Sequence, residues 1–196
     1  MSNTQNNNSI IKISIIAMLS AVSFVLFLLE FPVIPSLGHL KLDFSDVPAL
    51  IAGIIYGPFS AIVVEFIKNL IELLVKGVGT QMGFGNLMNF IVGCAYVVPF
   101  VICYRKISKN NTKIKGILIG SVIGIISILA FGFLSNYFIA PLFFKYFLGV
   151  ELDSAGLWAA VWGATVINAI KGIMLSVFSF PIIKIIIDRL KNILNN

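Results

Sequence analysis

The sequence predicts an all-α integral membrane protein with six transmembrane helices and a structured outward loop between the first two helices. Of the 196 residues, 59% are hydrophobic and only 11% are charged, and the mean hydropathy is +1.02. Soluble domains carry about 45–50% apolar and about 25% charged residues. A membrane-spanning helix needs roughly 20 mainly apolar residues, and the apolar residues here come in stretches of that kind. We therefore expect one membrane domain over residues 1–196.

The first two helices are expected on either side of a loop rich in turn residues. A polar N-terminal tail, residues 1–9, precedes a helix over about 10–29. The tail lacks a basic start and a small-residue cleavage site, which favours a retained span over a cleaved signal peptide. The segment 30–45 holds two prolines and a glycine and is expected to be a loop. A short helix follows over 46–56, with Asp46 placed as an N-cap ahead of a proline.

Four further helices follow from the remaining apolar stretches and their breaks. Gly57-Pro58 interrupts the chain, a glycine-rich loop is expected over 77–85, and a loop is expected around 141–154. The expected helices cover about 58–75, 86–104, 114–137 and 157–190.

The distribution of Lys and Arg predicts the orientation. Nine of these residues fall at the helix ends that share a side with both termini, and three fall at the opposite ends. Cytoplasmic loops carry the excess of Lys and Arg. We therefore expect a multi-pass protein of the bacterial cell membrane with both termini in the cytoplasm. The net charge of +6 has this topological explanation and does not indicate nucleic acid.

Several polar residues fall inside the expected spans and point to a binding site. An ionisable residue at the centre of a span costs about 2.5–3.5 kcal/mol, so it usually faces a cavity or a partner. Thr165, Asn168 and Lys171 follow at intervals of three and share one face of the last helix. The alternative is bonding to nearby backbone or to a buried acid. Asn136 offers an amide donor and acceptor near the end of the fifth helix, or simply caps that helix before Pro141.

Two other polar groups allow both a functional and a structural interpretation. Glu65 and Glu72 flank Lys68 at positions i−3 and i+4, which favours an ion-pair ladder within one helix over a scaffold or coupling role. In the first loop, apolar and polar residues alternate around Asp43. This segment is either a lid over a pocket or an ordinary surface loop. In the first helix, the small residues Ala17 and Ala21 would allow close approach of another helix.

Catalysis has little support in the sequence. The single histidine, His39, lies in a loop, and Cys94 and Cys103 fit neither a disulfide framework nor a metal site. There is no Gly-x-Ser-x-Gly motif and no Walker loop. We therefore predict no catalytic residues, no metal and no cofactor. The enzyme alternative is a membrane-embedded acid–base catalyst using Glu65 or Glu72.

These features resemble a known family. Six spans, Ala17-x-x-x-Ala21 and the lack of a nucleotide motif are similar to the substrate-binding S components of energy-coupling factor (ECF) transporters, and within them to the riboflavin-specific members. The matching segments are Lys41-Leu42-Asp43-Phe44-Ser45-Asp46-Val47-Pro48-Ala49-Leu50 running into Gly57-Pro58, Lys68-Asn69-Leu70, Asn136-Tyr137 with Pro141, and Asn168-x-x-Lys171.

The resemblance implies that the chain binds riboflavin as a transported ligand in an outward-facing pocket, with an S component for another vitamin as the alternative. It implies that Ala17 and Ala21 dock on a transmembrane coupling subunit, whose two ATPases of the ATP-binding-cassette type hydrolyse ATP and drive release inside. The residues implied to contact the ligand are Leu42, Asp43, Phe44, Asn136, Tyr137, Asn168 and Lys171.

Overall fold

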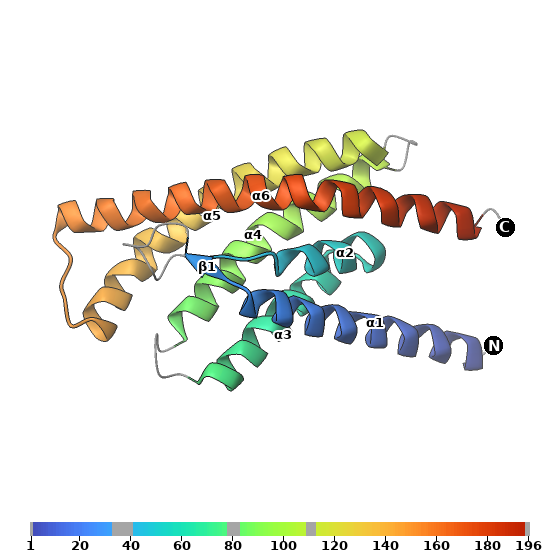
Figure 1. Cartoon of the computed structure of the whole chain (residues 1–196), viewed down its shortest axis with the longest axis horizontal. Coiled ribbons are helices and arrows are strands. Elements are labelled where there is room, and N and C mark those ends of the chain that lie inside the picture. The colour runs from blue at the N-terminus through green and yellow to red at the C-terminus, as the bar shows by residue number, and fades with distance from the viewer. Residues whose placement is uncertain (1, 33–40, 78–82, 109–112, 195–196) are drawn as a thin grey trace.

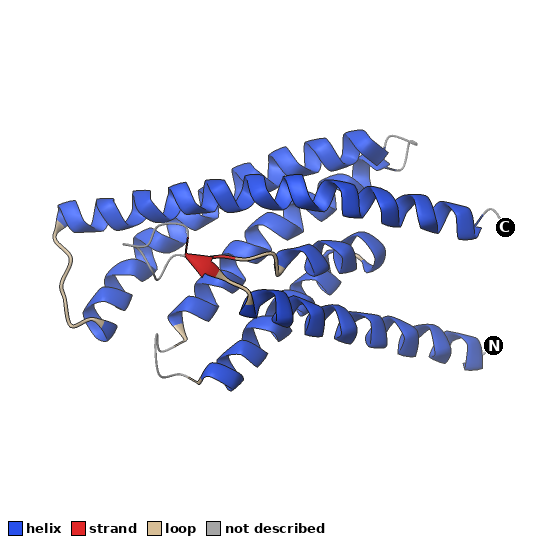
Figure 2. Cartoon of the chain, viewed as in Figure 1, coloured by secondary structure: helices blue, strands red, loops and turns tan. Residues whose placement is uncertain are grey.

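The computed structural model describes residues 2–32, 41–77, 83–108 and 113–194. Within these ranges the chain is a bundle of helices with one small antiparallel strand pair (Figure 2). Both termini lie at the same end of the bundle (Figure 1). The elements are α1 (Ser2–Leu28), β1 (Phe31–Pro32), β2 (Lys41–Leu42), α2 (Asp46–Tyr56), α3 (Pro58–Lys76), α4 (Phe84–Ile107), α5 (Lys113–Phe147) and α6 (Ser154–Leu194).

Most helices lie where the sequence predicts them, and three are longer than expected. α2 occupies the expected range, and α3 and α4 differ from theirs by a few residues. The predicted start of the first helix at about residue 10 is wrong, because α1 begins at Ser2 and includes the polar residues 2–9; once a helix has formed, each further residue adds a backbone hydrogen bond. α6 likewise extends beyond both of its predicted ends.

The predicted end of the fifth helix at Tyr137 is also wrong. α5 continues through Pro141 to Phe147. Proline removes one N–H from the helix, but in an apolar surrounding every other backbone polar group still needs an internal partner. Continuing the helix satisfies those groups, whereas the loop expected around Pro141 would leave them without partners.

The junction between α2 and α3 is a sharp reversal made by Gly57 and Pro58. Gly57 has a φ of 105°, in a region that residues with a side chain rarely adopt. Pro58 is the first residue of α3, where a helix needs no N–H. Arg105 of α4 donates to the carbonyl of Ile54 at 3.2 Å, so it satisfies one of the last carbonyls of α2.

The connection between α1 and α2 is pinned to the bundle on both sides. Phe31 pairs with Leu42 across the two strands, and Leu42 is buried. Phe44 packs edge-on against Phe178 of α6, with ring centroids 4.8 Å apart. Asp43, between two residues that face apolar surroundings, is therefore turned toward the interior. Residues 33–40, including His39, lie outside the described part of the chain.

Small residues bring α4 and α5 into close contact. Gly116, Gly120 and Gly124 follow at intervals of four along α5 and face Tyr104, Phe100 and Tyr96 of α4. A Cβ on Gly120 would lie 3.1 Å from the carbonyl oxygen of Phe100. Small residues at this spacing let backbones approach closely in membrane proteins.

The helices α2 and α3 differ from the other four in length and polarity. Four helical segments among the described residues are long and apolar enough to cross a membrane, namely Ser9–Leu28, Phe84–Ile107, Lys113–Tyr146 and Ser154–Ile186. α2 has only 11 residues, and α3 carries several charges. However, α3 is polar inside and apolar outside: Glu65 and Lys68 are completely buried, whereas Phe59 and Leu74 are 77% and 74% exposed.

Candidate ligand-binding site

The structure contains a cavity of about 260 Å³. The helix ends that supply most of its lining lie away from the two termini of the chain (Figure 1). Its walls come from the end of α3, the beginning of α4, the second half of α5 and the first half of α6, and Asp43 enters from the α1–α2 connection. Four phenylalanines contribute apolar surface: Phe27, Phe84, Phe143 and Phe144. The polar side chains of the lining are Glu30, Asp43, Glu72, Lys76, Asn86, Asn89, Asn136, Asn168 and Lys171.

The structure brings four of the seven sequence-predicted contact residues to this one cavity. Asp43, Asn136, Asn168 and Lys171 all belong to its lining, although they come from a loop and two helices. The other three, Leu42, Phe44 and Tyr137, are not among the described residues that line it. Leu42 and Phe44 pack within the α1–α2 connection and against α6, as described above. Tyr137 faces Trp158, with ring centroids 5.9 Å apart.

Asn136 and Asn168 both lie beside Gly132 of α5. Asn136 donates its Nδ2 to the carbonyl of Gly132 at 2.7 Å, so its amide oxygen is the group left to accept from a ligand. Asn168 is buried, and its Nδ2 has no hydrogen-bond partner among the described residues. Gly132 makes room for it, because a Cβ there would lie 2.3 Å from that nitrogen. A buried amide without a partner is costly, so this group favours a ligand.

Lys171 is held beside the cavity by two carboxylates. Its side chain is only 5% exposed, and its Nζ lies 3.0 Å from Oδ2 of Asp46 and 3.4 Å from Oδ2 of Asp43. These contacts explain how a lysine is tolerated inside an apolar bundle, since buried charges are found paired. The alternative interpretation of Lys171, bonding to a buried acid, is therefore also correct. Lys171 makes these ion pairs and at the same time belongs to the lining of the cavity.

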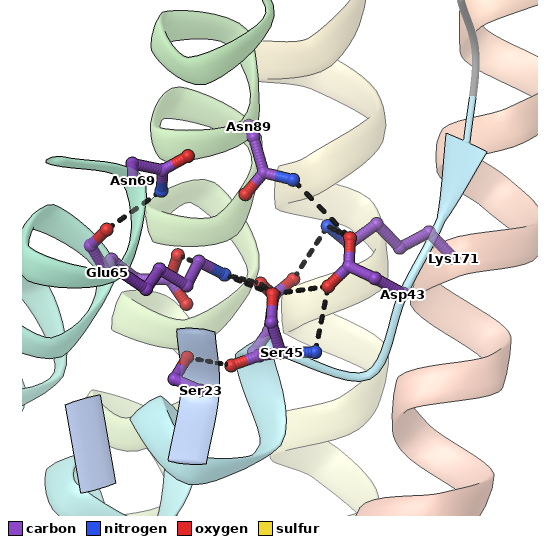
Figure 3. A network of polar contacts seen from close by, with 9 residues as sticks. Ser23, Asp43, Ser45, Glu65, Asn69, Asn89 and Lys171 are labelled. Carbon is purple, nitrogen blue, oxygen red and sulfur yellow. Dashed lines mark hydrogen bonds and ion pairs between the residues drawn. The ribbon is translucent and has the colours of Figure 1, made fainter. Parts of the chain in front are cut away.

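Asp43 is fixed by its own loop and by α4 (Figure 3). The backbone N–H of Ser45 donates to Oδ1 of Asp43 at 2.8 Å, and the Ser45 hydroxyl donates to the same oxygen. Asn89 of α4 donates to Oδ2 at 3.4 Å. The hydroxyl of Ser23 in α1 donates to the carbonyl of Ser45, which ties the first helix to this network. Asp43 is thus a preorganised acceptor at the cavity wall.

Behind the cavity lies an ion-pair cluster that corrects two expectations. Lys68 pairs with Glu65 at 2.7 Å, but its other carboxylate partner is Asp46 of α2 and not Glu72. Asp46 is the first residue of α2 and is completely buried, and its carboxylate pairs with lysines instead of capping the helix. Removing one partner of a buried pair of this kind costs about 3–5 kcal/mol.

Glu72 belongs to a second polar group, at the rim of the cavity. It pairs with Lys76 at 2.8 Å and accepts from Asn86 of α4. Lys76 also pairs with Glu30, beyond the end of α1, at 2.9 Å. The predicted ladder within α3 therefore divides into a buried half centred on Lys68 and a rim half centred on Lys76. The cavity consequently has one charged group behind it, around Lys68, and another at its rim, around Lys76.

A further ion pair at the same end of the molecule lies on the surface and outside the cavity. Lys145 and Glu151 lie 2.7 Å apart on either side of the end of α5, and both side chains are exposed. The hydrogen bond from Lys145 lowers the pKa of Glu151 below its ordinary value. Neither residue lines the cavity. Glu151 is therefore a suitable control for substitutions of the carboxylates in and behind the cavity.

Sequence reasoning missed several lining residues. Asn86, Asn89 and Glu72 line the cavity, and Asp46 supports it from behind. The sequence did contain a sign that Asp46 is buried and paired, because it is a carboxylate at the start of an otherwise apolar helix. Its position shortly before Pro48 suggested an N-cap instead. The two asparagines near the start of α4 carry the same weak signal as Asn136.

Comparison with known proteins identifies the family. A sequence model of the family described as ECF transporter, substrate-specific component, matches residues 12–183. The riboflavin transporter FmnP of Bacillus subtilis is 36% identical over 177 residues, covering 89% of this chain and 91% of that protein. The riboflavin transporter RibU of Staphylococcus aureus is 32% identical over 194 residues, covering 97% of this chain and 96% of that protein.

The fold is likewise similar to that of a solved transporter subunit. The solved S component of a bacterial ECF transporter superposes with a TM-score of 0.69 at 29% identity, covering 98% of this chain and 99% of that one. The apolar helices and this family assignment mark a membrane protein. The chain belongs to the family of substrate-specific components of ECF transporters.

Proposed function

We propose that this chain is the riboflavin-binding S component of an ECF-type importer, and that the cavity described above holds the vitamin. The observation that carries the proposal is the convergence of Asp43, Asn136, Asn168 and Lys171 on one cavity with aromatic walls. Ligand pockets are typically apolar with a few placed polar groups. The names of the relatives, which are riboflavin transporters, support this choice of ligand.

The chemistry of the cavity suits the two parts of riboflavin. Its flat ring is apolar on both faces and has an edge where hydrogen-bond donors and acceptors alternate. We assign the ring to the phenylalanine surfaces and its polar edge to Asn136, Asn168 and Lys171, whose amides and ammonium supply both kinds of group. The hydroxylated ribityl tail would then meet Asp43 and the polar rim. Phe44, Leu42 and Tyr137 would act indirectly, through packing.

The proposed topology has six membrane spans with both termini in the cytoplasm. α3 and the shorter α2, which at 11 residues would cross only part of the bilayer, complete the six. α3 turns Glu65, Lys68 and Glu72 into the bundle and its phenylalanines outward, as charged transmembrane helices do. The excess of Lys and Arg at the end that carries the termini supports the orientation. The cavity then opens outward, and the α1–α2 connection with its strand pair lies on the outer side.

In the proposed transport cycle this chain binds and releases the vitamin, and partners hydrolyse ATP. Ala17 and Ala21 are both exposed on the same face of α1, which gives a helix of another subunit a shallow surface to approach. We assign that surface to a transmembrane coupling subunit that works with two ATPases of the ATP-binding-cassette type. The chain would thus be a transport subunit and not an enzyme.

A thermal-shift panel of vitamins tests the choice of ligand. A ligand that binds only the folded state adds about 2.7 kcal/mol of stability at one hundred times its Kd. We expect riboflavin to raise the Tm of the purified chain more than any other vitamin in the panel. If another vitamin raises the Tm and riboflavin does not, the scaffold is that of an S component with a different substrate.

A further inference from the structure

Asp46 occupies a position behind the cavity from which it contacts two lysines at once. One carboxylate oxygen, Oδ2, lies 3.0 Å from Nζ of Lys171 in α6. The other, Oδ1, pairs with Nζ of Lys68 in α3. Asp46 itself is completely buried and is not among the described residues that line the cavity, whereas Lys171 is. Asp46 therefore reaches the cavity only through Lys171.

A lysine needs such a partner to present its ammonium in one direction. Its stem has four rotatable carbons, and its charge has no preferred plane of hydrogen bonding. The other carboxylate near Lys171, Asp43, accepts a hydrogen bond from Nζ at the longer distance of 3.4 Å and is also engaged by Ser45 and Asn89. Asp46 thus makes the shorter of the two ion pairs that fix where the Lys171 ammonium lies.

Lys68 in turn holds Asp46 in place. Its Nζ also forms an ion pair with Glu65 at 2.7 Å and donates a hydrogen bond to the Ser45 hydroxyl at 2.7 Å. Glu65 sits against α4, where a Cβ on Gly93 would lie 2.5 Å from its Oε2. The cluster therefore spans the start of α2, α3, α4 and α6, so the orientation of Asp46 is determined by several elements.

We propose that Asp46 is a positioning residue for ligand binding: it aims the Lys171 ammonium at the polar edge of the ligand, and Lys68 anchors Asp46 for this purpose. This inference rests on the proposed function, in which Lys171 contacts the vitamin. It assigns a binding role to a residue that touches no ligand. It also gives the buried charges of α3 a purpose beyond stability.

A double-mutant cycle in the full-length detergent-purified chain tests the proposal. Riboflavin affinity is measured by quenching of flavin fluorescence for the wild type, Asp46→Asn, Lys171→Met and the double variant. We expect Asp46→Asn to weaken binding at least about tenfold when Lys171 is present, and by less than about twofold in the Lys171→Met background. Equal losses in both backgrounds would mean that Asp46 acts only through the fold and would overturn the proposal.

The visible absorption band of bound riboflavin gives a second readout that general destabilisation does not move. A nearby ammonium perturbs the flavin chromophore, so at saturating riboflavin the band of Asp46→Asn should shift toward that of Lys171→Met. A band that remains at the wild-type position would contradict the proposal.

Two further variants keep the test decisive. Glu151→Gln is the control, because it removes a carboxylate that belongs neither to this cluster nor to the described cavity lining, so riboflavin affinity should stay within about twofold. Should Asp46→Asn fail to fold because Lys68 keeps only Glu65 as an ion-pair partner, the same cycle is run in a Lys68→Met background. A smaller coupling is expected there, because Lys68 no longer anchors Asp46, and a complete lack of coupling would overturn the proposal.

The wild-type titration separates this proposal from the proposed function. Wild-type protein that fails to bind riboflavin contradicts the proposed ligand, and the cycle is then run with the vitamin that gives the largest thermal shift in the panel. Absence of binding to every vitamin would overturn both proposals. Binding of riboflavin without coupling between Asp46 and Lys171 would overturn only the positioning role.

Discussion

Lys171 and Asn168 differ in the polar partners that the protein gives their side chains, and this difference determines what each would contribute to ligand binding. Lys171 is paired with two carboxylates, whereas the Asn168 Nδ2 has no partner among the described residues. In the proposed complex both would gain a hydrogen bond to the ring edge. Lys171 would bring a charged donor that is already oriented, and Asn168 would exchange an unsatisfied amide for a satisfied one.

We predict that Lys171→Ala and Asn168→Ala each weaken riboflavin binding at least tenfold. Hydrogen bonds to charged groups are worth about 1.5–3 kcal/mol, and an unsatisfied buried group costs a similar amount. Fluorescence titration measures the effect, with Glu151→Gln as a control carboxylate outside the cavity lining. Wild-type affinity in both alanine variants would place the binding site elsewhere.

Gly132 gives a milder test of the same pocket. We predict that Gly132→Ala keeps the fold but lowers riboflavin affinity, because the new Cβ would lie 2.3 Å from Nδ2 of Asn168 and would displace that flexible side chain. The comparison is with Gly172→Ala, where the Cβ would meet only apolar atoms of Ile125 and Ile128 at 3.2 Å or more. If the two variants bind riboflavin equally well, Asn168 is not held for the ligand by Gly132.

At the residue scale, the sequence predicted the polar residues that line the cavity better than the apolar and aromatic residues beside them. The cost of a polar group in a span singled out Asn136, Asn168 and Lys171 without any structure. Tyr137 directly follows Asn136 on a helix, so it points about 100° away and faces Trp158 instead. Leu42 pairs with Phe31 in the strand pair and Phe44 packs against Phe178, so neither joins Asp43 in the cavity lining.

The helices show where element-scale prediction reaches its limit. The end of α2 was predictable because Gly57 and Pro58 leave the chain few conformations. The end of α5 was not, because proline stops helices in water but is tolerated within membrane helices, and nothing in the local sequence distinguishes the two cases. The partner of Lys68 was not predictable either, since Asp46 lies on another helix and the spacing within α3 suggested Glu72.

α1 carries a prediction that separates binding from transport. Ala17 and Ala21 are exposed and are far from the cavity lining. We predict that Ala17→Trp with Ala21→Trp leaves riboflavin affinity unchanged but abolishes association with the coupling subunit and riboflavin uptake in cells. Val177→Trp, which adds the same bulk at a 62% exposed position of α6, should leave both unchanged. Normal uptake by the α1 variant would show that this face does not dock.

On the scale of the whole molecule, composition and charge distribution were enough to predict a helical membrane protein. They could not predict the cavity, because its walls come from segments as distant in sequence as Asp43 and Lys171, which meet where β2 and α2 contact α6. The inside-out polarity of α3 was also hidden, since its charges look like a water-facing stripe until the bundle surrounds them.

The visible absorption spectrum of the purified full-length chain tests the central claim most directly. The proposed function predicts a yellow protein with flavin absorption bands, or a colourless one that acquires them and quenches flavin fluorescence when riboflavin is added. A folded protein that is colourless and leaves the fluorescence of added riboflavin unchanged would contradict the claim that this cavity binds riboflavin.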